Sequence, residues 1–131
     1  MDRSRSLEEL DRDRWPVPPA DATRLVAAVY ALRRRPIGAL TVEDLRLLIG
    51  QDVGLPHLLP LALEVLRDNP MAEGDMYEGD LLSAVVTRAP AAWSESLELK
   101  QELRVILLEL ADLPLDLQQK VDRFLGATPR P

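Results

Sequence analysis

The sequence predicts an all-α fold: a single-domain bundle of six or seven short helices around a central apolar helix at about residues 55–69. Three observations support this prediction. Apolar residues recur three and four positions apart in every strong segment, and no alternating strand pattern of useful length is present. The stretch 55–66 is apolar on nearly every side, which is typical of a helix buried among others. Aromatic residues make up only 4% of the chain against 47% hydrophobic residues, so Leu, Val and Ala must build the core.

The chain has the length of one domain, with 131 residues. We therefore expect a single helical domain over 1–131. Its first part, 1–20, is expected to be an N-terminal arm, and 127–131 is expected to be a frayed tail.

The arm contains both a helix signal and a helix-breaking segment. Ser6 and Glu9 have the spacing of a capping box, which predicts a short helix at about 7–12. Residues 15–19, Trp-Pro-Val-Pro-Pro, must be extended because proline lacks an amide donor and restricts its neighbours. We expect Trp15 to anchor the arm on the bundle.

The next predicted helix, at about 22–34, runs into three consecutive arginines, 33–35. Three arginines can bind an anion, but cations in a last turn also complement the helix dipole, and we favour this structural role. A further helix starts at Thr41, with Asp44 at the capping-box position, and Gly50 is its expected end. The central helix is expected to start near Pro60 or to be kinked there.

Three helices complete the prediction. The first follows Asp80, which is its expected cap, and ends before Pro90. The longest is opened by Ser94 and covers about 95–112, and a last amphipathic helix ends at Gly126.

An acidic, turn-rich run follows the central helix. Its four carboxylates fall within eight residues, and Met76 and Tyr77 lie in the middle of the run, where an ordinary solvated loop would be polar. An aromatic residue ringed by like charges has the composition of an interface hot spot with an acidic rim. Met76 and Tyr77 could equally fold back onto the core, and the carboxylates could belong to a solvated loop that caps the next helix. The candidate partner-binding residues are Glu73, Asp75, Tyr77, Glu78 and Asp80.

The charge of the chain is concentrated in its middle. Residues 41–90 hold three basic and nine acidic groups, a local charge equal to the net charge of -6 of the whole chain. Such an excess repels nucleic acid and attracts basic surfaces.

Nothing in the sequence has the composition of a reaction centre. The chain has no Cys, its only histidine is His57 at the start of the apolar helix, and no glycine-rich phosphate loop is present. The acidic run lacks the order of an EF-hand loop, and the second helix of a conceivable helix-turn-helix offers only one basic residue, Arg67, to contact DNA. We therefore expect no enzyme activity, no cofactor, no metal and no nucleic acid. A catalytic carboxylate pair, Glu73 and Asp80, is the least favoured alternative.

The N-terminus lacks the apolar core of a secretory signal, and no apolar run approaches a membrane-spanning length. The absence of cysteine fits a reducing compartment. We expect a cytoplasmic protein without membrane contact.

Several short blocks, taken in order, resemble one family. They are Ser6-Leu7-Glu8-Glu9-Leu10 followed by Trp15; Leu40-Thr41-Val42-Glu43-Asp44-Leu45-Arg46 with Ile49-Gly50-Gln51; Gly54-Leu55-Pro56 with Pro60-Leu61-Ala62-Leu63-Glu64; and Glu73-Gly74-Asp75 with Tyr77 and Gly79-Asp80-Leu81-Leu82. Over about residues 6–93 the chain is similar to immunity proteins of contact-dependent growth inhibition (CDI) systems.

This resemblance implies a small cytoplasmic antidote that binds the C-terminal toxin domain delivered by a neighbouring cell and covers its active site. Toxins of such systems are often nucleases, which are often basic, so an acidic surface on the antidote would suit them. We expect a monomer or a weak homodimer. The alternative is a non-enzymatic helical adaptor or a structural protein that self-associates through an exposed apolar face at about 97–110.

Overall fold

The computed structural model describes residues 3–126, and within them it contains seven α-helices, two short 3-10 helices and no strand. The predicted all-α fold class is therefore confirmed. The predicted tail at 127–131 lies outside the described residues. The elements are α1 (Leu7–Asp11), α2 (Arg24–Arg33), η1 (Ile37–Ala39), α3 (Val42–Gly50), α4 (Leu55–Asp68), α5 (Asp80–Val86), η2 (Pro90–Ala92), α6 (Leu97–Leu108) and α7 (Leu115–Gly126).

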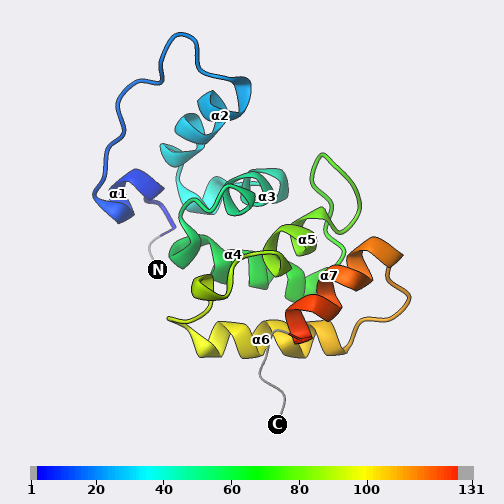
Figure 1. Ribbon diagram of the computed structural model, residues 1–131. Coiled ribbons are helices and arrows are strands. Elements are labelled where there is room, and N and C mark those ends of the chain that lie inside the picture. The colour runs from blue at the N-terminus through cyan, green and yellow to red at the C-terminus, as the bar shows by residue number, and fades with distance from the viewer. Residues whose placement is uncertain (1–2, 127–131) are drawn as a thin grey trace.

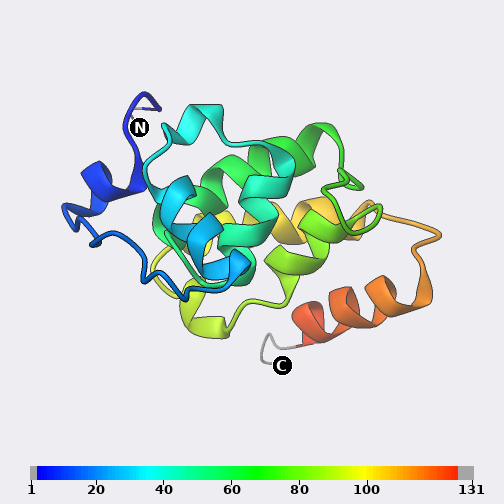
Figure 2. The ribbon, with the colours of Figure 1, turned by 90° about the horizontal axis from the view of Figure 1, so that it is seen from above.

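Helix α4 is the central element that the sequence predicts. It packs against α3, α5 and α6. Figure 1 shows it between α3 above and α6 below, and in the view from above α6 is partly hidden behind the other helices (Figure 2). The expectation that it starts near Pro60 is wrong, because the helix begins at Leu55 and continues through Pro60. Its N-cap Gly54 has a left-handed backbone conformation (φ 66°). Six side chains of α4 are buried, and the free energy gained by burying them outweighs the loss of the one backbone hydrogen bond that Pro60 removes.

Helix caps explain most of the boundaries. Both predicted capping boxes are present: Ser6 with Glu9 begins α1, and Thr41 with Asp44 begins α3. The longest predicted helix is shorter than expected, Leu97–Leu108 in place of 95–112. Its cap is Ser96, whose hydroxyl accepts a hydrogen bond from the Leu99 amide. Ser94 donates its hydroxyl to the Ala91 carbonyl at 2.9 Å and so belongs to the preceding turn.

The N-terminal arm is fastened to the bundle at several points. Leu7 is fully buried in the core, and the Ile37 amide donates to the Arg5 carbonyl at 2.9 Å. Trp15 makes an edge contact with Tyr30, with ring centroids 4.9 Å apart, and the Arg33 guanidinium lies 3.9 Å from the Trp15 ring centroid. Trp15 therefore has the anchoring role expected of it, and Arg33 serves the same purpose.

The loop between α4 and α5 projects from the bundle beside α3 (Figure 1). Helix α5 packs against both α3 and α7, so the loop lies near three helices from distant parts of the chain. No helix in the described part of the chain combines the length and the apolar character needed to cross a membrane.

Candidate functional site

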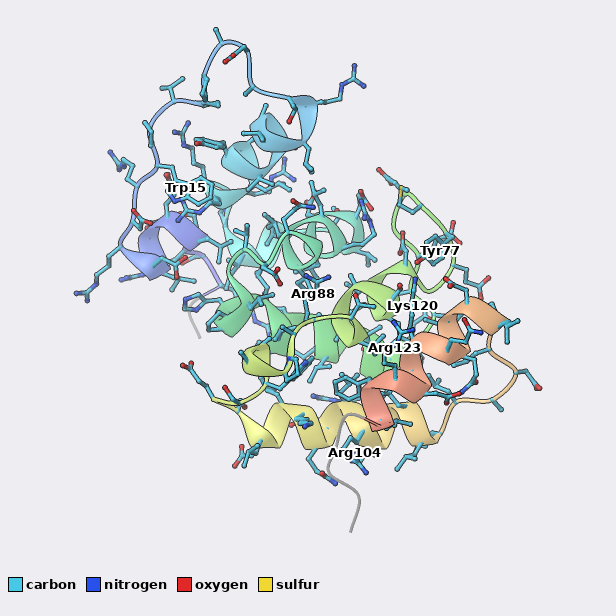
Figure 3. The ribbon with its side chains drawn as sticks, in the orientation of Figure 1. Trp15, Tyr77, Arg88, Arg104, Lys120 and Arg123 are labelled. Carbon is cyan, nitrogen blue, oxygen red and sulfur yellow. The ribbon has the colours of Figure 1, made fainter. Side chains whose placement is uncertain are left out.

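The residues 73–80, which we call the acidic loop, connect α4 to α5. Glu73, Asp75 and Glu78 are exposed, and among the described residues none of the three forms an ion pair. Met76 is 65% exposed and Tyr77 is 44% exposed. The loop thus presents two large apolar side chains between three unpaired carboxylates, and Tyr77 lies at the edge of the molecule near α7 (Figure 3).

Asp80 has a different environment from the other four predicted residues. It is only 2% exposed, and its carboxylate accepts hydrogen bonds from the backbone amides of Gly74 at 2.7 Å and Met76 at 3.0 Å. A longer bond of 3.4 Å comes from the Tyr77 amide. Asp80 is the first residue of α5 and the cap position belongs to Gly79, whose backbone is left-handed (φ 85°). Its carboxylate therefore folds the loop around itself and is not available to a partner.

An ion pair on α3 supports the same loop. Arg46 donates two hydrogen bonds of 2.6 Å to the Glu43 carboxylate, and its Nε lies 3.7 Å from the Asp80 carboxylate. The hydrogen bonds from Arg46 hold the pKa of Glu43 below its ordinary value, and Glu43 in turn raises the pKa of Arg46. Glu43 also accepts the Asp75 amide at 2.9 Å. Four backbone amides of the loop therefore donate hydrogen bonds to two carboxylates, Asp80 at the start of α5 and Glu43 on the distant helix α3.

Gly74 is the point where the loop comes closest to α3. A Cβ atom at this position would lie 2.6 Å from Glu43 Oε1 and 3.2 Å from Glu43 Cα. Real Cβ atoms do not approach other atoms this closely without a shift. A larger residue at this position would therefore force the Glu43 carboxylate or the loop backbone to shift.

On its other side the loop contacts α7 through Lys120. The Lys120 ammonium lies 6.0 Å from the Tyr77 ring centroid, 2.9 Å from Ser83 Oγ and 3.1 Å from the Asp116 carboxylate. Burial alone would lower the pKa of Lys120, but the hydrogen bond to Asp116 and the contact with Tyr77 outweigh it and raise the pKa. Tyr77 thus contacts Lys120 of α7, while much of its side chain remains exposed to solvent.

The structure brings together all five predicted residues, but it divides them by role. Glu73, Asp75, Tyr77 and Glu78 face solvent, whereas Asp80 is internal. Sequence reasoning missed Glu43, Arg46 and Lys120, which support the loop. The spacing of Glu43 and Arg46 on one helix was the only local signal for the first two, and Lys120 had none.

Two other candidates have simple structural explanations. His57 Nε2 lies 3.0 Å from the Asp11 carboxylate, so the one histidine is paired within the chain. Glu73 and Asp80 do not share a cleft, because Asp80 is buried under the loop and Glu73 is exposed. Within residues 3–126 no group of three or more His, Cys, Asp or Glu side chains is placed to hold a metal ion.

Comparison with known proteins identifies the family of the chain. No curated protein matches the chain. The profile of one family, described as CDI immunity proteins, matches residues 9–103, which include the helices α2 to α5 and the whole acidic loop. Because this match covers most of the sequence, the chain belongs to the family of CDI immunity proteins.

Proposed function

We propose that this immunity protein binds its cognate toxin domain through the acidic loop and blocks it without any catalysis of its own. The single observation that carries the proposal is the pair Met76 and Tyr77, exposed among three unpaired carboxylates on a loop that is internally fixed. Central aromatic residues with a charged rim are typical of binding hot spots.

The fixed shape of the loop is part of the proposal. Ordering a loop on binding costs free energy, and a loop that is already ordered avoids that cost. Asp80 and Glu43 hold the backbone of the loop, so its exposed side chains need little rearrangement to meet a partner.

The charge of the loop favours a basic toxin surface. A nuclease domain is the class that fits best, because surfaces that bind nucleic acid carry excess positive charge. The carboxylates of Glu73, Asp75 and Glu78 would then compete with nucleic acid phosphates for the same cations. The site of this inhibition would be the cytoplasm of the protected cell.

Binding measurements on two loop variants test the proposal. Asp75→Ala and Tyr77→Ala are expected to weaken binding of the cognate toxin domain by at least tenfold each, while the thermal midpoint changes little because both side chains are exposed. Glu98→Ala removes an exposed carboxylate from α6 and is the matched control. If both loop variants bind the toxin as tightly as the control does, the acidic loop is not the interface.

A second candidate rests on the outer face of α6. Leu97, Val105 and Leu108 are 72%, 51% and 68% exposed, and their spacing places them on one side of the helix. Such a stripe favours self-association. Sedimentation velocity decides between the candidates: a dimer that Leu108→Glu abolishes, together with unchanged toxin binding by the loop variants, would favour the self-associating protein.

A further inference from the structure

A second concave site lies away from the acidic loop, where the end of α5 and η2 meet α6 and α7. The cavity has a volume of about 300 Å³. Four cations line it: Arg88, Lys100, Lys120 and Arg123. Among the described residues no carboxylate lines it, although the chain as a whole carries a net charge of -6. We call it the cationic pocket.

Two of the four cations form ion pairs with carboxylates of the described residues, and the other two do not. Arg88 Nη1 lies 2.7 Å from the Asp52 carboxylate, and the Lys120 ammonium lies 3.1 Å from the Asp116 carboxylate. Lys100 and Arg123 form no ion pair with any described residue. The charges of Lys100 and Arg123 are therefore not neutralised by an ion pair, and inside a concave site they attract an anion more strongly than they would on an open surface.

The cationic pocket is also lined by apolar and aromatic side chains. Trp93 and Phe124 are both buried and meet edge to face, with ring centroids 5.7 Å apart. Val86 lines the pocket as well. The indole N–H of Trp93 is buried and finds no acceptor among the described residues, which leaves one donor of a lining residue unused.

This combination selects for one kind of ligand. An aromatic wall favours a planar apolar ring, and an unpaired arginine beside a lysine favours a phosphate, which the guanidinium fork can hold through two hydrogen bonds. The volume is at the lower end of ligand pockets, so one ring system and one phosphate group would fill it.

An extended polyanion fits the surroundings poorly. Lys120 lines the cationic pocket and also lies 3.1 Å from the Asp116 carboxylate, so negative charge lies close to one rim of the pocket. That carboxylate and the net negative charge repel a long nucleic acid strand but affect a small ligand less. We propose that the cationic pocket binds a small aromatic phosphate monoester of the size of a nucleoside monophosphate.

Isothermal titration of the full-length chain at low salt, with adenosine monophosphate, inorganic phosphate and adenosine as probes, tests this proposal. The nucleotide is expected to bind at least tenfold more tightly than either phosphate or adenosine, because only the nucleotide uses both the aromatic and the cationic side chains. Lys100→Gln and Arg123→Gln are each expected to weaken nucleotide binding at least tenfold. Arg24→Gln, which neutralises an exposed arginine on α2, is the matched control and should leave binding unchanged.

Several results would overturn the proposal. They are no nucleotide binding at millimolar concentration, equal binding of adenosine, equal binding of phosphate alone, or full binding by the Lys100 and Arg123 variants. Tighter binding of a short single-stranded oligonucleotide than of the mononucleotide would show that the ligand is a polymer and would also overturn it. Thermal melting of each variant confirms folding, which we expect to be unaffected because neither side chain has an ion-pair partner among the described residues.

Discussion

The buried carboxylate of Asp80 accepts the backbone amide of Gly74 at 2.7 Å, and this bond closes the acidic loop over the start of α5. The loop is therefore built around an internal negative charge that Arg46 compensates from α3. The exposed carboxylates form no ion pair with Arg46, although the charge of Asp75 adds to the fields of Glu43 and Asp80 that raise the pKa of Arg46. Stability and toxin binding should accordingly respond to different substitutions.

Replacement of Asp80 tests the internal half of this arrangement. Asp80→Ala is expected to lower the free energy of unfolding by about 3 kcal/mol, because several loop amides and Arg46 lose their acceptor in a buried environment. Asp75→Ala, at an exposed position in the same loop, should stay within about 0.5 kcal/mol of the parent chain. Urea unfolding of both variants measures the difference. Equal stability of the two variants would mean that Asp80 does not organise the loop.

Two glycine substitutions form a second matched pair. Gly74→Ala would place a Cβ atom 2.6 Å from Glu43 Oε1, so it is expected to cost about 1–3 kcal/mol and to weaken toxin binding by distorting the loop. Gly50→Ala adds a Cβ atom with nothing within 4 Å in the last turn of α3, so it should be neutral or stabilising by up to about 1 kcal/mol. Thermal denaturation gives both values. A Gly74→Ala chain as stable as the parent would rule out the close contact with α3.

Much of the fold follows from local sequence signals, and this explains which predictions succeeded. Ser6 with Glu9 and Thr41 with Asp44 lie within one helical turn of each other, so their caps can be read from spacing alone. The continuation of α4 through Pro60 depends on the burial of the side chains beyond it, and that is a tertiary effect.

The candidate site was only partly predictable for the same reason. Composition identified the acidic run, and the sequence predicted Asp80 both as a helix cap and as a binding residue, but it did not predict that the Asp80 carboxylate is buried under the loop. The partners that separate Asp80 from Asp75 are Arg46 and Glu43, which lie more than 25 residues away in the chain. The cationic pocket was not predicted, because its four cations are spread from the end of α5 to α7.

Acidification should weaken the support of the loop by α3. The pKa of Glu43 is lowered in the folded protein, mainly by its hydrogen bonds to Arg46, so the ionised side chain stabilises the fold above the pKa of the unfolded chain. This contribution is lost as the pH falls below about 4.3 and through the folded pKa. The thermal midpoint measured between pH 7 and pH 3 should therefore fall less steeply for Glu43→Gln than for the parent chain. Parallel curves would exclude a contribution from Glu43.

Ionic strength should affect the rate of toxin association. If the acidic loop meets a basic surface, the association rate constant should fall by about tenfold or more between low and high salt, because salt screens the attraction that guides encounter. Stopped-flow measurements on a loop variant that neutralises all three exposed carboxylates should give a much flatter dependence. The control neutralises three exposed carboxylates elsewhere and should keep the dependence of the parent chain. The loop substitutions are Glu73→Gln, Asp75→Asn and Glu78→Gln, and the control substitutions are Asp21→Asn, Glu98→Gln and Glu109→Gln.

The backbone of the acidic loop is held by Glu43, Arg46 and Asp80, and none of these three belongs to its outward face. The side chains at 73 and 75–78 are therefore not needed to maintain the scaffold that displays them. If the acidic loop is the toxin-binding surface, its exposed side chains can be exchanged one at a time while the helical framework that holds the loop is kept.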